Sequence, residues 1–203
     1  MIQVKRFSHA TMETPDTARQ TDYFTQVLGL QVAGKENGHV HLASKVGDLV
    51  VQLNKADQSR CTKLSFQVDP HTSLADLKKG LEAEGIKGEE RSDAAPGIGK
   101  ALVFKDPKGT EIEVFAEQKQ ITGPQQVPGI GPLKLGHLAF CVDDCKKYAE
   151  FYCKVLGFRV SDWIEDWFVF LRCGPDHHTI NFVRGQRIHM HHIAFELKDW
   201  AQV

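Results

Sequence analysis

Hydrophobic and polar positions along one segment predict a strand followed by a helix. Within 135–142, Leu138, Phe140 and Val142 alternate with His137 and Ala139, which is the pattern of a β-strand. Further along, apolar residues recur at positions i, i+3, i+4, i+7 and i+8, which predicts a helix with one apolar stripe: Tyr148, Phe151, Tyr152, Val155 and Leu156. An aspartate at 143 or 144 can cap the start of this helix, and a glycine at 157 can end it in the left-handed conformation.

The same pattern occurs earlier in the chain. A shift of 128 residues aligns His9 with His137, Asp16 with Asp144, and 27–29 with 155–157, without a gap. A weaker half-period aligns 64–68 with 193–197 and places Lys63 opposite His192. The chain therefore reads as four βαβββ units, at 4–55, 60–116, 133–184 and from 188 onward.

These repeats predict an α+β fold in which paired βαβββ modules form two half-open barrel domains, the second incomplete. Further strands are expected at 40–42, 49–53, 101–105, 111–115, 167–173 and 179–183. The segment Asp106-Pro107-Lys108-Gly109 has the chemistry of a type I turn. Because glycine and proline concentrate at 123–132, we expect an N-terminal domain at 1–118, a linker at 119–132 and a C-terminal domain at 133–203.

The overall composition narrows the class of protein. The chain has 203 residues, with 25 Lys and Arg against 26 Asp and Glu, and this balance disfavours nucleic acid or a membrane surface as a partner. No apolar run reaches the roughly 20 residues of a membrane span, and the first residues lack a secretion signal. The five cysteines form no CxxC pair, so we expect reduced thiols and a cytoplasmic location.

The histidines are the candidate chemistry. His137 and His192 both leave the bulky face of their strands, so they could line a cavity and bind one metal ion together. Alternatively, each is an isolated strand histidine that hydrogen-bonds a neighbour. His178, in a His-His-Thr run, could move protons beside a metal pocket, or it is a solvated loop histidine. His191 is expected to point to the face opposite His192, and His41 belongs to no partner motif.

Taken together, Gly136-His137-Leu138-Ala139-Phe140, His177-His178-Thr179 and 191–195 resemble the vicinal-oxygen-chelate superfamily, and within it the type I extradiol catechol dioxygenases. The resemblance implies that His137 and His192 bind Fe(II), with Mn(II) as the alternative. It implies that His178 is the acid–base residue and contacts the substrate. Asn181, three residues further along and on the following strand, is a further candidate contact for the substrate ring. A catechol-type aromatic compound and O₂ would be the substrates, and the protein would form a homo-oligomer.

At two positions the chain departs from the complete set of metal ligands that the resemblance implies. The resemblance implies a third ligand, a glutamate near position 241, which lies beyond residue 203. We therefore expect a truncated chain with a native length of about 280–300 residues; a degenerate protein, or a ligand supplied by a partner chain, are the alternatives. In the first repeat the matching residues are His9, Lys63 and Glu113, and because an ammonium group has no lone pair we expect no metal there.

The function predicted from the sequence is ring cleavage of a catechol beside its hydroxyl groups. A glyoxalase-like metal-dependent isomerase or lyase is the alternative enzyme. A metal-free binding protein of the bleomycin-resistance type is the alternative without catalysis. Neither alternative needs an acid–base histidine at 178.

Overall fold

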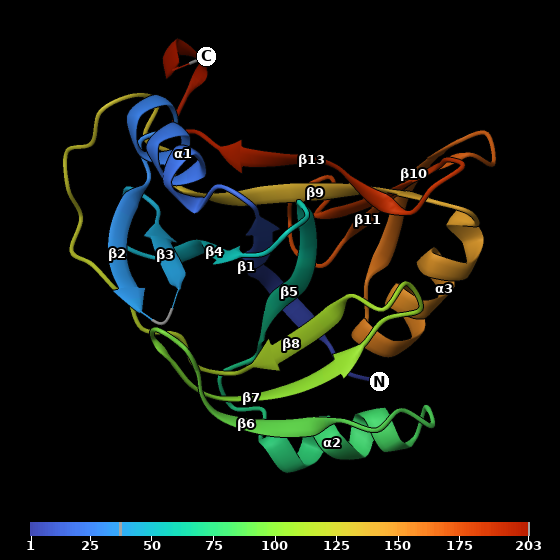
Figure 1. Ribbon diagram of the computed structural model, residues 1–203. Coiled ribbons are helices and arrows are strands. Elements are labelled where there is room, and N and C mark those ends of the chain that lie inside the picture. The colour runs from blue at the N-terminus through green and yellow to red at the C-terminus, as the bar shows by residue number, and fades with distance from the viewer. Residues whose placement is uncertain (37, 203) are drawn as a thin grey trace.

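The computed structural model describes residues 1–36 and 38–202, and these residues form two β-sheets with helices on their outer faces (Figure 1). The large sheet has eight strands in the order β2-β3-β4-β1-β5-β8-β7-β6, and the small sheet has five in the order β10-β11-β12-β9-β13. This arrangement confirms the predicted α+β fold with a smaller second sheet.

The strands of the large sheet are β1 (Val4–Thr14), β2 (Gln31–Glu36), β3 (His39–Ala43), β4 (Leu49–Lys55), β5 (Arg60–Val68), β6 (Glu89–Ala95), β7 (Ile98–Lys105) and β8 (Glu111–Phe115). Those of the small sheet are β9 (Lys134–Val142), β10 (Arg159–Ile164), β11 (Phe168–Arg172), β12 (Ile180–Arg184) and β13 (His189–Glu196). The helical segments are α1 (Thr17–Asp22), a π-helical turn η1 (Tyr23–Val27), α2 (Leu74–Glu82), α3 (Cys145–Leu156) and a 3₁₀ turn η2 (Trp200–Gln202).

Strand pairing repeats between the two sheets in the register that the sequence repeat predicts. Thr11 of β1 pairs with Lys63 of β5, and Ala139 of β9 pairs with His192 of β13. The next pair on the same face is His9 with Ser65 in the large sheet and His137 with Ala194 in the small one. The large sheet continues from β5 to β8, whereas β13 pairs with β9 alone among the described residues. The second, smaller sheet therefore repeats part of the strand pairing of the first.

The longest helix forms where the apolar stripe predicts it. In α3, Tyr148, Tyr152 and Leu156 are buried, and the helix contacts β10, β11 and β12. The carboxylate of Asp144 accepts hydrogen bonds from the first-turn amides of the helix, which satisfies donors that would otherwise lack partners. At the other end Gly157 has φ 73°, so it provides the left-handed cap that a residue with a Cβ adopts only at a cost.

The two sheets contact each other through aromatic side chains and one buried polar cluster. Phe66 of β5 packs edge-on against Phe158, which follows α3, with ring centroids 5.6 Å apart. The predicted 106–109 turn inserts beside α3, where the hydroxyl of Tyr152 donates to Asp106 at 2.9 Å. Lys108 forms an ion pair with the same carboxylate, and its side chain is almost fully buried. These contacts join the large sheet to the small one.

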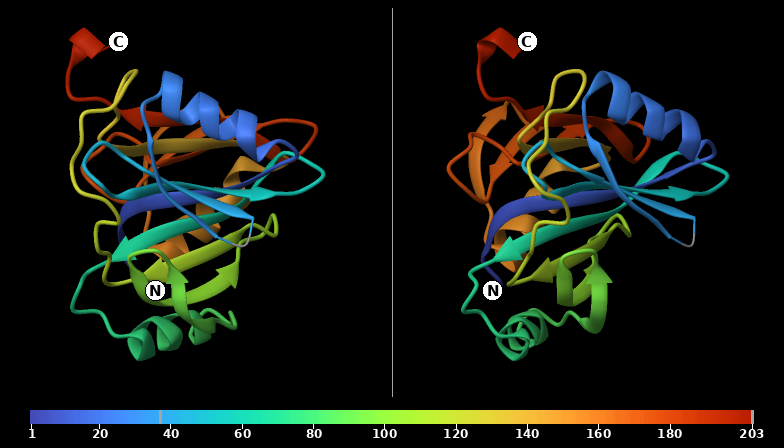
Figure 2. Two further views of the ribbon diagram at one scale, coloured as in Figure 1. Left: turned by 60° about the vertical axis from the view of Figure 1, so that its left-hand side comes forward. Right: turned by 90° about the vertical axis from the view of Figure 1, so that its left-hand side faces the viewer.

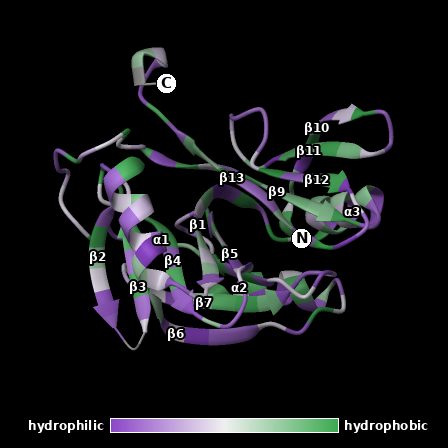
Figure 3. Cartoon of the chain, turned by 45° about the horizontal axis from the view of Figure 1, so that its top comes forward, coloured by the Kyte–Doolittle hydropathy of each residue, from purple (hydrophilic) through white to green (hydrophobic). Residues whose placement is uncertain are grey.

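Polar edge strands are the part of the fold that the alternation of apolar and polar residues does not predict. Hydrophilic residues dominate β6 and the end of β2, the two edges of the large sheet (Figure 3). Charged edge strands hinder pairing with other chains, and the same charges weaken the alternation by which strands are found in a sequence. β10, at the edge of the small sheet, is likewise not predicted by alternation.

The remaining observations concern the linker, the cysteines, membrane-spanning helices and the last turn of the chain. The stretch 116–133 contains no helix or strand, but the predicted linker at 119–132 and the domain bounds stay predictions. All five cysteines are described and have free thiols. No helix among the described residues is long and apolar enough to cross a membrane. The turn η2 extends away from both sheets, and Trp200 in it is 88% exposed (Figure 2).

Candidate metal and acid–base site

The structure brings His137 and His192 together on one face of the small sheet. They lie on the neighbouring strands β9 and β13, two register positions apart, because His137 pairs with Ala194 and His192 pairs with Ala139. Their Nε2 atoms are 2.9 Å apart. Two strand histidines from different repeats thus direct the same ring nitrogen to one point.

Burial keeps these imidazoles neutral near pH 7. Desolvation, and then the neighbouring His178 and His192, lower the pKa of His137 to about 4. Burial also lowers the pKa of His192, with a further contribution from His191. A neutral imidazole has a lone pair on one ring nitrogen, so the electrostatics of the site favour metal ligation over a pair of cationic rings.

His178 lies beside this pair, in the loop that leads into β12. Its ring centroid is 4.3 Å from that of His137, and its Nδ1 is 3.0 Å from Nδ1 of His177. Burial, followed by the charges of His177 and His192, lowers the pKa of His178. His178 is therefore a neutral base in contact with the His137 ring.

The separation of the two Nε2 atoms fits two adjacent positions on one metal ion. Two metal–nitrogen bonds of about 2.1 Å at a right angle place their nitrogens about 3 Å apart. The same 2.9 Å separation also suits a hydrogen bond between one protonated and one unprotonated nitrogen. Among residues 1–36 and 38–202, no group of three or more His, Cys, Asp or Glu side chains is placed to hold a metal ion.

A row of paired residues continues this face across the sheet. Phe170 of β11 pairs with Asn181 of β12, which pairs with Ala139, which pairs with His192. Asn181 is fully buried, and its Oδ1 has no hydrogen-bond partner among the described residues. The ring of Phe170 is 5.3 Å from that of His178. The structure therefore places Asn181 and an aromatic wall on the same face as the histidines.

Strict strand alternation places His191 on the face opposite His192, but His191, which is exposed, contacts the ring of His192. A register shift between Met190 and His192 interrupts the pairing of β13 with β9. The Nδ1 atoms of His191 and His192 lie 2.7 Å apart, so His191 contacts the site from its exposed edge. No sequence signal marks this bulge, since it depends on how β13 pairs with β9.

Comparison with known proteins assigns this chain to a family. The sequence profile of the Glyoxalase/Bleomycin resistance protein/Dioxygenase superfamily matches residues 6–114 and 134–203. The chain belongs to this superfamily.

Within the superfamily, the relatives found are extradiol dioxygenases. The chain is 28% identical to a biphenyl-2,3-diol 1,2-dioxygenase of Paraburkholderia xenovorans, over all of this chain and 74% of that protein. It is 25% identical to a 3-methylcatechol 2,3-dioxygenase of Pseudomonas putida, over 93% of this chain and 72% of the relative. Other relatives are named as an iron-dependent extradiol dioxygenase and a manganese-dependent 2,3-dihydroxybiphenyl 1,2-dioxygenase.

Solved structures of the superfamily share the fold. The 2,3-dioxygenase LapB of Pseudomonas sp. KL28 superposes with a TM-score of 0.86 at 24% identity, covering all of this chain and 78% of that one. A Mn(II)-bound glyoxalase of Novosphingobium aromaticivorans superposes with a TM-score of 0.85 at 26% identity, covering all of this chain and 68% of the other. The fold is therefore common to proteins with two different named activities.

Proposed function

We propose that this protein cleaves the ring of a catechol-type aromatic compound with O₂, using Fe(II) held in part by His137 and His192. Mn(II) is the alternative metal. The observation that carries the proposal is the convergence of the two neutral imidazoles, with Nε2 atoms 2.9 Å apart, beside the third histidine His178. The relatives found, which are named as dioxygenases of catechol-type compounds, support the choice of substrate.

A divalent metal held there would supply Lewis-acid and redox chemistry for a substrate with two neighbouring hydroxyl groups and O₂. Two histidines do not complete such a site, which would need a third ligand, an oxygen donor, from outside the described residues. An acidic residue near position 241 is the donor that the repeat projects.

His178 would move the substrate proton. Its lowered pKa leaves the imidazole neutral near pH 7, so a ring nitrogen can accept a proton from a substrate hydroxyl and later return it. Contact with the ring of His137 places this base next to the ligand pair. Removal of His178 should therefore impair proton transfer without removing a metal ligand.

Aromatic side chains would bind the substrate ring. Phe168 and Phe170 stack on each other with centroids 4.3 Å apart, and Phe170 contacts His178. Asn181, in the same cross-sheet row as Phe170, has an unpartnered amide oxygen that could accept a hydrogen bond from a substrate hydroxyl. These residues favour a flat aromatic ligand with polar substituents along one edge.

The proposal is tested by ring-cleavage activity of the product of the complete gene. The protein is loaded with Fe(II) without oxygen, and 2,3-dihydroxybiphenyl or 3-methylcatechol is then added in air. We expect a yellow ring-fission product with consumption of one O₂ per substrate. His178→Ala should retain iron and lose at least a hundredfold in kcat, whereas His189→Ala, a change at an exposed residue, should retain activity. Full activity in His178→Ala would contradict its acid–base role.

A glyoxalase-like reaction is the second candidate, because the manganese-bound glyoxalase shares this fold at 26% identity. Such an enzyme would isomerise or cleave its substrate without using O₂. Metal binding with no oxygen consumption on any catechol would favour it. Binding of an aromatic ligand without any metal would instead indicate a binding protein.

A further inference from the structure

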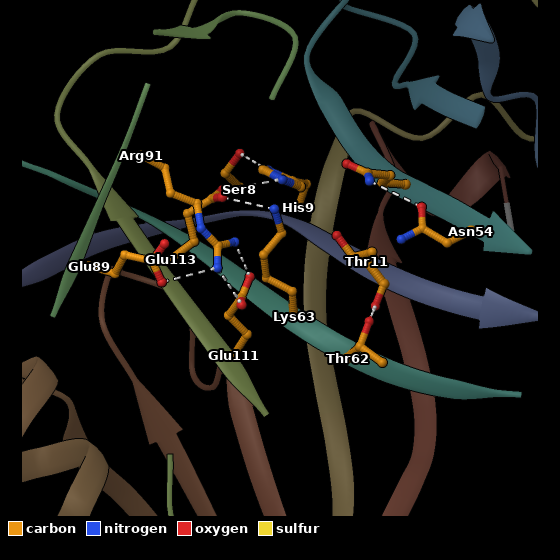
Figure 4. Close-up of polar contacts among 11 residues, drawn as sticks. Ser8, His9, Thr11, Asn54, Thr62, Lys63, Glu89, Arg91, Glu111 and Glu113 are labelled. Carbon is orange, nitrogen blue, oxygen red and sulfur yellow. Dashed lines mark hydrogen bonds and ion pairs between the residues drawn. The ribbon is translucent and has the colours of Figure 1, made fainter. Parts of the chain in front are cut away.

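The inner face of the large sheet carries a second cluster of polar side chains at the positions equivalent to the candidate site. Lys63 pairs with Thr11 as His192 pairs with Ala139, and His9 pairs with Ser65 as His137 pairs with Ala194. The next strand, β8, brings Glu113 opposite Ser65. Figure 4 shows Lys63 reaching toward Glu113 beside His9.

Hydrogen bonds fix the tautomer of His9. The hydroxyl of Ser8 donates to Oε1 of Gln118 at 2.8 Å, and the same hydroxyl oxygen lies 3.1 Å from Nδ1 of His9. Since the hydroxyl proton is already used, Nδ1 of His9 is the donor in that contact. In the neutral ring, Nε2 of His9 therefore carries the lone pair.

That lone pair points at a carboxylate. Nε2 of His9 lies 3.6 Å from Oε2 of Glu113, both side chains are fully buried, and neither atom has a hydrogen-bond partner among the described residues. Two acceptors that face each other away from water repel each other unless a positive group lies with them. The ammonium of Lys63, 2.8 Å from Oε1 of Glu113, is the positive group that the chain provides.

We propose that His9 and Glu113 are two potential ligands of a latent divalent-cation site, which binds no metal in this chain because the ammonium of Lys63 occupies the place of the cation. An ammonium group neutralises the carboxylate but cannot accept a lone pair, so it leaves Nε2 of His9 unsatisfied. A first-row divalent ion would satisfy both atoms. A histidine at 63 would stand where the small sheet has His192 and would complete a set of two histidines and one carboxylate.

The test uses the full chain in a His137→Ala, His192→Ala background, so that binding at the candidate site of the small sheet does not contribute. Co(II) alone is titrated, and its visible absorption bands report ligation by protein groups. With Lys63→His added, we expect one Co(II) per chain and an affinity at least tenfold above that of the background. Adding His9→Ala or Glu113→Gln should remove that gain. No gain on Lys63→His, or a gain that survives loss of His9, would overturn the proposal.

A second variant covers the case in which Lys63→His does not fold. Lys63→Met removes the ammonium while its neighbours His9 and Glu113 remain. In the same background, Zn(II) should raise the melting temperature of Lys63→Met by several degrees, and it should not raise that of Lys63→Met combined with Glu113→Gln. An equal response of the two variants to Zn(II) would show that the His9–Glu113 pair does not bind the ion.

Discussion

Burial determines the protonation state of the individual histidines in the candidate site. His137, His178 and His192 all have lowered pKa values, and desolvation is the largest cause for each. The rings of His178 and His192 both contact the ring of His137, so a proton on one ring raises the energy of a proton on its neighbour. At neutral pH the site therefore holds lone pairs, which is what metal binding and proton acceptance both need.

This electrostatic arrangement predicts a pH dependence of stability. The pKa of His137 is about 4 in the folded chain, against about 6.5 for an ordinary histidine. Between these values the unfolded chain binds more protons, so the free energy of unfolding should fall as the pH is lowered from about 6.5 to about 4. Urea unfolding across this range should show a shallower fall for metal-free His137→Gln than for the metal-free wild type. Equal slopes would contradict the lowered pKa.

For individual residues, the sequence predicts which side chains share a face of the sheet but not which side chains contact one another. Alternation and the 128-residue repeat predict that His137 and His192 share a face, and the structure brings their Nε2 atoms together. The contact of His191 with His192 depends on a register shift in β13. The hydrogen bond from Ser8 to Gln118, which helps to orient His9, joins two residues that are 110 positions apart in the sequence. Such contacts follow from the curvature and pairing of the sheet, which local patterns do not contain.

Among the elements, the helix ends show how local sequence sets structure. α3 starts at an aspartate cap and ends at Gly157, as its pattern predicts. The strands β2, β6 and β10 lie at sheet edges, where polar side chains obscure alternation. Elements with one clearly buried face are therefore predictable from the sequence, and edge elements depend on neighbours that come from elsewhere in the chain.

Replacing Gly157 or Gly85 by alanine tests how closely the chain packs at the C-terminal end of α3. Gly157 and Gly85 both have positive φ after a helix, at 73° and 70°. A Cβ at 157 would lie 2.8 Å from the carbonyl oxygen of Ile2, whereas a Cβ at 85 would meet nothing within 4 Å. Gly85→Ala should cost about 1 kcal/mol of unfolding free energy, and Gly157→Ala at least about 1 kcal/mol more. Equal losses in thermal or urea unfolding would argue against close packing of the N-terminal segment on α3.

At the scale of the whole molecule, the relative position of the two sheets depends on the contacts between them. Asp106 of the large-sheet half accepts a hydrogen bond from Tyr152 of α3 and pairs with Lys108, whose ammonium lies 4.4 Å from the ring centre of Phe140 in β9. The carboxylate and both partner side chains are buried. A buried charge cluster is costly to leave incomplete, so it fixes how the sheets are joined.

Removal of one hydroxyl tests this junction. Tyr152→Phe deletes the donor to Asp106 and should lower the free energy of unfolding by about 1–3 kcal/mol, because a buried carboxylate oxygen loses a partner. Tyr23→Phe, at a side chain that is half exposed, is the matched control and should change stability by less than about 0.5 kcal/mol. Similar small losses in both variants would place the stability of the junction in its aromatic contacts alone.

The central claim, that His137 and His192 hold one metal ion, is tested most directly by anaerobic Fe(II) titration of the product of the complete gene. Calorimetry should find one tightly bound ion per chain in the wild type and in His189→Ala. Either His137→Ala or His192→Ala should lower the affinity for that ion at least a hundredfold. Retention of the ion at unchanged affinity in either variant would contradict the account.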